Sequence, residues 1–147
     1  TTAGAGDTLG RRFDQLAAML DGLGRRSARA GVCLDTCHIF AAGYDLRGAR
    51  RAVAVLDALD AAVGLDRLGA VHLNDSVGEL GSGRDRHAHI GSGRIGRAGF
   101  GALVRDRRLA EVPMILETPK GTDDRGRDWD TINARLLRRL AAARRRR

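Results

Sequence analysis

Carboxylate and imidazole side chains recur in this sequence at the ends of short apolar runs. Asp35, His72 and Glu117 each stand at or near the last position of such a run. A single strand-end histidine is often only hydrogen-bonded, and a single aspartate often caps the following turn. Burying two carboxylates and an imidazole together, however, costs several kcal/mol unless they are paired or bound to a metal. The three positions therefore favour a shared metal site.

Two closely spaced pairs enlarge this set of residues. Asp35 and His38 lie three residues apart, in what we expect to be a tight turn. Asp85 and His87 lie two apart, where an extended backbone would direct both side chains at one point. Asp, Glu and neutral His are ligands of Zn²⁺, but six of them are too many for one tetrahedral ion. The sequence thus predicts a multi-metal site, and its predicted ligands are Asp35, His38, His72, Asp85, His87 and Glu117.

The remaining histidine and the two cysteines carry less specific signals. His89 lies two residues beyond His87 and is open to three roles: metal ligand, donor to a ligand, or phosphate contact. Cys33 and Cys37 are spaced C-x3-C, and no second pair completes a four-cysteine zinc site. We interpret them as free, buried or partly buried thiols, which fits a reducing cytoplasm. We therefore predict a cytoplasmic location.

Three strands are predicted to position the ligands. The segments 31–35, 69–73 and 112–117 are too short for helices and apolar on both faces, as parallel strands between helices should be. Side chains alternate along a strand, so the ligands share a face with small or functional residues. The other face should pack on helices, and its members are Val32, Leu34, Val71, Leu73, Met114 and Leu116.

Helices are predicted to alternate with these strands. Apolar residues at helical spacing mark four of them, over about 13–23, 52–63, 98–106 and 129–140. The order α-β-α-β-α-β-α indicates an α/β fold with a parallel sheet of βα units. Catalytic groups of βα barrels lie at the C-terminal ends of strands, as the predicted ligands do. We therefore expect a partial TIM (β/α) barrel of about three parallel strands and four flanking helices.

Charge and composition limit the kinds of partner that the chain could bind. The chain has 147 residues, of which 43% are hydrophobic and 30% charged, and no apolar run is long enough to span a membrane. Its net charge of +8 suits a polyanion, and its cations are almost all arginine, which grips phosphate oxygens well. High arginine usage can also reflect the base composition of the gene. The run 144–147 is expected to be a basic tail, and the long polar stretch 74–96 a functional or unstructured loop.

The ordered motifs resemble those of one known family. Gly31-Val32-Cys33-Leu34-Asp35-Thr36-Cys37-His38 and its continuation over 40–47 resemble a signature of the endonuclease IV family of apurinic/apyrimidinic endonucleases. The motifs His72-Leu73-Asn74-Asp75-Ser76, Gly81-Ser82, Asp85-Arg86-His87 and Ile115-Leu116-Glu117-Thr118 are similar to the same family. The resemblance covers nearly the whole chain. Because the motifs occur in order and with consistent separations, it is specific.

This resemblance implies a fold, a cofactor and a reaction. The family is a TIM-type barrel with three zinc ions per complete, monomeric enzyme. It cuts double-stranded DNA 5′ to an abasic site and leaves a 3′-hydroxyl and a 5′-deoxyribose phosphate. The motif positions assign Asp35, His72 and Glu117 to a paired zinc site and the other three predicted ligands to a third zinc. They also make Glu117 the candidate catalytic base for the attacking water.

Departures from the family pattern concern mainly what lies upstream. The family has a bridging zinc glutamate just before the position of Thr1 and two more histidine ligands further upstream. Within the chain, Val77 stands where a lysine is common and Ser92 where an acidic residue is common. Three strands cannot close a barrel. We therefore expect residues 1–143 to be the C-terminal part of a single eight-stranded barrel domain, a fragment that alone binds zinc poorly and does not cleave DNA.

Two other classes of function stay open. Sugar isomerases and epimerases with similar barrels also place Glu, Asp and His at strand ends around divalent metals. The reaction of those enzymes does not require the extra pair Asp85 and His87, nor a basic surface. The second alternative is a non-catalytic remnant that binds DNA or zinc without turnover.

Overall fold

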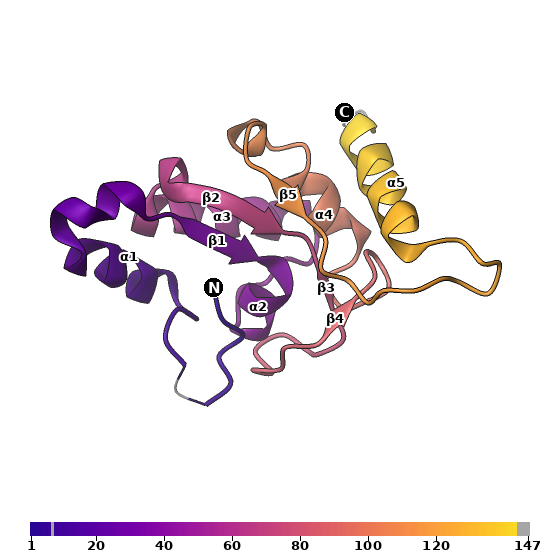
Figure 1. Cartoon of the computed structure of the whole chain (residues 1–147), viewed down its shortest axis with the longest axis horizontal. Coiled ribbons are helices and arrows are strands. Elements are labelled where there is room, and N and C mark those ends of the chain that lie inside the picture. Colours follow the sequence, from indigo (N-terminus) through magenta and orange to yellow (C-terminus); the bar gives the residue numbers. More distant parts are fainter. Residues whose placement is uncertain (7, 144–147) are drawn as a thin grey trace.

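Three parallel strands form the centre of the structure, a computed structural model that describes residues 1–6 and 8–143. The strands are β1 (Val32–Asp35), β2 (Leu68–His72) and β5 (Met114–Ile115), in the order β1-β2-β5 (Figure 1). Both neighbouring pairs are parallel. The predicted α/β class with a parallel sheet is therefore confirmed, while the predicted tail 144–147 lies outside the described residues.

The four predicted helices are all present. They are α1 (Phe13–Gly22), α3 (Ala49–Val63), α4 (Arg97–Leu103) and α5 (Trp129–Ala142). Figure 1 shows α3 and α4 behind the sheet, with α1 and α5 towards opposite ends of the molecule. Short 3₁₀ segments over 24–29, 65–67 and 107–109 add to the connections. Within the described residues, no helix has both the length and the apolar character needed to cross a membrane.

Two elements contradict the expected turn and the expected structureless loop. The residues after β1 form a helix, α2 (Thr36–Ala41), rather than a tight turn. It begins at Asp35, whose carboxylate accepts the N–H groups of Cys37 and His38 at 2.8 and 3.1 Å, a strong helix N-cap. The stretch 74–96 contains an antiparallel hairpin of β3 (Asp75–Ser76) and β4 (His87–Ala88).

A buried carboxylate explains why this polar stretch is ordered. The side chain of Asp75 is fully buried and accepts the backbone N–H groups of Gly91, Gly93 and Ile95 at 2.9, 3.1 and 2.9 Å. Such hydrogen bonds to a charged acceptor are among the strongest in proteins. Any side chain at Gly93 would meet the Ser76 carbonyl oxygen, 2.4 Å from an ideal Cβ position. The chain after β4 is thus wrapped tightly around one carboxylate.

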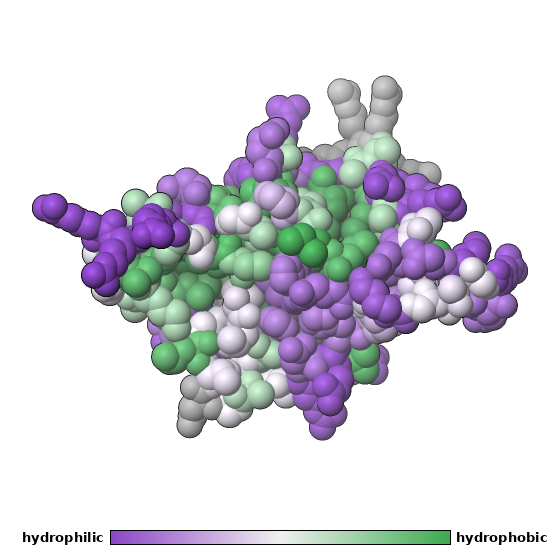
Figure 2. Space-filling view, in the orientation of Figure 1, coloured by the Kyte–Doolittle hydropathy of each residue, from purple (hydrophilic) through white to green (hydrophobic). Residues whose placement is uncertain are grey.

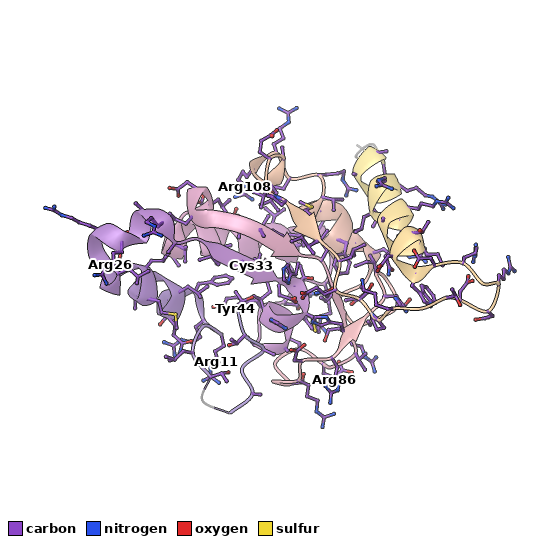
Figure 3. All side chains as sticks on the ribbon, viewed as in Figure 1. Arg11, Arg26, Cys33, Tyr44, Arg86 and Arg108 are labelled. Carbon is purple, nitrogen blue, oxygen red and sulfur yellow. The ribbon has the colours of Figure 1, made fainter. Side chains whose placement is uncertain are left out.

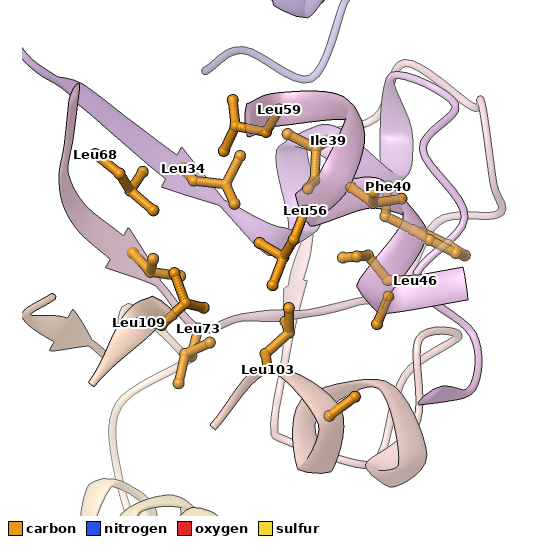
Figure 4. Close-up of a cluster of buried hydrophobic side chains, with 14 of the residues drawn as sticks. Leu34, Ile39, Phe40, Leu46, Leu56, Leu59, Leu68, Leu73, Leu103 and Leu109 are labelled. Atoms are coloured by element: carbon orange, nitrogen blue, oxygen red, sulfur yellow. The ribbon is translucent and has the colours of Figure 1, made fainter. Parts of the chain in front are cut away.

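The hydrophobic core lies on one side of the sheet. Leu34, Val71 and Leu73 are at most 1% exposed, as the alternation predicted. Figure 4 shows Leu34 and Leu73 in one cluster with leucines of the helices, such as Leu56 and Leu103. The same prediction is wrong for Met114, which is 36% exposed, because β5 is a two-residue strand at the sheet edge. The other face is more open: Ile115 is 44% exposed, and Figure 2 shows hydrophobic residues gathered over the strands on this side.

Candidate metal centre

Strand register brings the first three predicted ligands together. Asp35 is the partner of His72 across β1 and β2, and His72 is the partner of Ile115 on β5, two residues before Glu117. The Nδ1 atom of His72 lies 2.8 Å from the Glu117 carboxylate and 3.6 Å from that of Asp35. Donor atoms of all three residues lie within 4.8 Å of one another, a spacing that one metal ion can bridge.

The other three predicted ligands converge on the same end of the sheet. The first turn of α2 carries His38, and the hairpin loop supplies Asp85 and His87. The Nε2 atoms of His38 and His87 each lie 3.1 Å from an Asp85 carboxylate oxygen. The Nε2 atom of His87 is also 3.8 Å from Asp35, so Asp35 belongs to both groups. Arg86, between the two loop ligands, points away from the strands (Figure 3).

Backbone carbonyl groups set the tautomers of two histidines. The Nδ1 atom of His38 is 3.0 Å from the Thr1 carbonyl oxygen, and that of His87 is 3.0 Å from the Glu117 carbonyl oxygen. A carbonyl only accepts, so each Nδ1 carries a hydrogen, and in the neutral imidazole each Nε2 presents a lone pair to Asp85. Both Nε2 atoms are buried without a hydrogen bond of normal geometry. Metal-binding histidines typically donate one ring N–H to a carbonyl group and turn the other nitrogen to the metal. His38 and His87 have this geometry, and a cation between their Nε2 atoms and the Asp85 carboxylate would be bound by all three residues.

Asn74 is a site residue that the sequence reasoning missed. It is completely buried, its Nδ2 donates to the Asp35 carboxylate at 2.8 Å, and its Oδ1 accepts the backbone N–H of Glu117 at 2.9 Å. Its own backbone N–H donates to the Thr36 hydroxyl at 2.8 Å. One amide thus fixes two predicted ligands on non-adjacent strands. The available signal was an amide directly after a buried strand, at the ligand-bearing end.

Removing this amide should loosen the proposed ligands without removing one. We expect Asn74→Ala to lower zinc affinity by about 10–100-fold, the usual cost of losing an outer-shell partner. Zinc titration against a chelating indicator measures this change. Ser82→Ala, an exposed change in the loop after Asn74, should leave affinity unaltered. Equal zinc affinity in folded Asn74→Ala and wild type would show that Asn74 has no role at the centre.

The last histidine, left open by the sequence, is directed elsewhere. His89 stacks on Trp129 of α5 with ring centroids 3.7 Å apart and an interplanar angle of 11°. Its Nδ1 atom lies 3.2 Å from the Nδ2 atom of Asn133. Burial lowers the pKa of His89 below its ordinary value. Among the described residues, the groups with metal-ligand spacing do not include His89.

The cysteines are free, as interpreted from the sequence. Cys37 is fully buried in α2, with its Sγ 3.6 Å from the Arg86 carbonyl oxygen, while Cys33 is partly exposed. Burial raises the pKa of both thiols. Cys37 also has ligand spacing to Asp85 and His87, but its hydrogen-bonded thiol makes it a less ready ligand than the histidines.

Comparison with known proteins places this geometry in a family. The family described as the xylose isomerase-like TIM barrel matches residues 1–142, so the chain belongs to it. The crystal structure of endonuclease IV from Thermus thermophilus superimposes with a TM-score of 0.80 and 45% identity. That match covers 97% of this chain and 48% of the other.

Curated relatives agree with the structural match. The "Probable endonuclease 4" of Oleidesulfovibrio alaskensis is 53% identical over 140 residues, 95% of this chain and 46% of that protein. The "Apurinic-apyrimidinic endonuclease" of Caenorhabditis elegans is 49% identical over 121 residues, 82% of this chain and 30% of that protein. The chain therefore spans at most about half the length of these relatives. The resemblance to endonuclease IV indicated by the motifs is confirmed.

Proposed function

We propose that this chain carries part of the active site of a zinc-dependent DNA-repair endonuclease that hydrolyses the phosphodiester 5′ to an abasic site in double-stranded DNA. The observation that carries the proposal is the convergence of the six predicted ligands at one end of the sheet. Five of them form two groups that share Asp35, and Asp85 lies 3.1 Å from both His38 and His87. The names of the relatives, endonuclease 4 and apurinic-apyrimidinic endonuclease, support the choice of substrate.

The proposed roles follow from the position of each side chain. Bound zinc would supply a water of lowered pKa and positive charge for the phosphate oxygens. Glu117 lies two residues after the last strand with its side chain 46% exposed, which leaves a carboxylate oxygen able to take a proton from the attacking water. Asp35, only 3% exposed at its side chain, instead holds the two ligand groups together.

Exposed arginines next to the centre suit the DNA backbone. Arg84 and Arg86 flank Asp85 and are both exposed, so their guanidinium groups are accessible to phosphate oxygens. Phosphate contacts of this kind hold a duplex in place without reading its sequence. An abasic nucleotide is also easily drawn out of the stack, which would bring its phosphate to the centre.

We also propose how the chain relates to the complete enzyme. Residues 1–143 would form the C-terminal part of one monomeric TIM-barrel domain, and the remaining strands would complete a centre of three zinc ions. A cytoplasmic location fits the free thiols of Cys33 and Cys37. The alternative of a sugar isomerase offers no use for Asp85 and His87, which lie 3.1 Å from each other, with His87 also 3.8 Å from the shared Asp35.

A chimera tests this function. Residues 1–142 replace the matching half of the Thermus thermophilus endonuclease IV, and the protein is incubated with a duplex that carries one abasic site. We expect a single nick 5′ to that site with a 3′-hydroxyl product, abolished by a chelator and restored by zinc. The intact duplex and ketose sugars serve as control substrates. A folded, zinc-loaded chimera that converts a ketose, or that leaves the abasic duplex intact, would overturn the proposal.

A further inference from the structure

We propose that Asn133 of α5 is a positioning residue that ties the loop carrying His87 to the strand end carrying Glu117, and thereby sets the metal affinity of the centre. The proposal rests on the proposed function, because it assigns Asn133 a part in that metal site. It concerns a residue 16 positions beyond Glu117, on a helix that carries none of the predicted ligands.

The carboxamide of Asn133 is fully used by groups from both segments. Asn133 is 1% exposed, and its Oδ1 accepts the backbone N–H of Ile90 at 3.0 Å. Its Nδ2 donates to the Thr118 hydroxyl at 2.9 Å and lies 3.2 Å from the Nδ1 atom of His89. An amide has one acceptor oxygen and two N–H donors, so all three are satisfied. The partners directly follow the ligands: His89 and Ile90 come after His87, and Thr118 comes after Glu117.

The segments that carry His87 and Glu117 have little secondary structure of their own to hold them in place. β5 ends at Ile115 and α5 begins at Trp129, so Glu117 stands in a described stretch that contains neither helix nor strand. β4 is only two residues long and pairs only with the two-residue β3. The His87 imidazole does reach the Glu117 carbonyl oxygen, at 3.0 Å. Asn133 joins the same two segments through its contacts with His89, Ile90 and Thr118.

A ring stack strengthens this connection. Trp129, one helical turn before Asn133, stacks on His89 with nearly parallel rings whose centroids lie 3.7 Å apart. Residues four apart lie on one helix face, so the indole and the amide of α5 hold the same loop together. Because buried polar networks lose much of their strength when one member is removed, a single substitution at Asn133 should release the loop.

The test measures loop order in the 147-residue chain and metal affinity in the chimera described above. Hydrogen exchange of the Ile90 amide is followed in metal-free protein, and Co²⁺ and Zn²⁺ titrations give the affinity. We expect Asn133→Ala to accelerate Ile90 exchange and to weaken metal binding by about 10–100-fold, as for an outer-shell partner. Thr118→Val should act in the same direction, and Thr118→Ser, which keeps the hydroxyl, should restore wild-type values. Thr131→Ala, an exposed change on the same helix, is the control.

The outcomes separate positioning from simple stabilisation. Loss of thermal stability in Asn133→Ala with unchanged metal affinity would reduce Asn133 to a structural residue and overturn the proposal. If Asn133→Ala does not fold, Thr118→Val decides: unchanged Ile90 exchange and metal affinity would likewise overturn it. An unchanged chimera that binds neither metal would refute the metal centre itself. Ile90 exchange would then still show whether Asn133 orders the loop.

Discussion

In the chimera, Asp35→Asn is expected to abolish tight zinc binding, with a larger loss than any outer-shell change. Asp35 belongs to both ligand groups, so one substitution removes a charged ligand from each. The new amide would also set an NH₂ or a neutral oxygen against the Nδ2 of Asn74, which now donates to the carboxylate at 2.8 Å. The affinity should therefore fall by well over the ~100-fold that marks the upper range of outer-shell losses.

The measurement is a zinc titration together with the number of ions retained after gel filtration. Asp21→Asn, an exposed change of the same chemistry on α1, controls for the loss of one negative charge. The cap of α2 should survive in part, because an asparagine oxygen still accepts the Cys37 and His38 N–H groups. Far-UV circular dichroism should thus stay close to wild type. Undiminished zinc affinity in Asp35→Asn would contradict a shared ligand.

Glu117→Gln in the chimera is expected to reduce incision of abasic DNA by about 10²–10⁴-fold, the range for loss of a general base. The amide cannot take a proton from water and is a poorer metal ligand than a carboxylate. Glu117 belongs to only one ligand group, whereas Asp35 belongs to two. Glu117→Gln should therefore keep the metal bound by His38, Asp85 and His87, and lose less zinc than Asp35→Asn.

Single-turnover incision, with zinc content measured on the same samples, separates catalysis from metal loss. Glu111→Gln is the matched control, because Glu111 is exposed ahead of β5, at the opposite end of that strand from Glu117. Its incision rate should equal that of the unchanged chimera. A Glu117→Gln chimera with full zinc content and an unchanged incision rate would remove Glu117 from the chemistry.

The sheet could be predicted because its determinants are local. Strand alternation and the α-β order sufficed to place Asp35 beside His72 and to direct Leu34 and Val71 to the helices. They failed at Met114, where burial depends on how far the edge strand extends and on what covers it. The helix α2 was missed because an aspartate that ends a strand and one that caps a helix look alike in sequence.

The supporting residues of the site could not be predicted, because their partners are distant along the chain. Asn74 contacts Asp35 and Glu117 at separations of 39 and 43 residues, and Asn133 contacts Ile90 at 43. Short motifs reveal charged ligands, whose burial is costly and therefore informative, but a neutral amide resembles any loop residue. Only the tertiary structure determines which amide side chains hydrogen-bond to the segments that carry the ligands.

The electrostatics of the predicted ligands favour a bound cation. Asp35 and Asp85 each lie within 4 Å of histidine nitrogens, and two of those nitrogens present lone pairs when the imidazoles are neutral. Acceptors facing acceptors at about 3 Å are unfavourable unless positive charge lies between them. Divalent cations supply that charge and also orient a phosphate for attack.

Anomalous diffraction at the zinc edge from zinc-soaked crystals of the chimera would locate the bound ions. We predict separate zinc peaks: one among Asp35, His72 and Glu117, and another beside His38, Asp85 and His87. Zinc found only elsewhere on the molecule, with these six side chains well ordered and metal-free, would contradict the proposed centre.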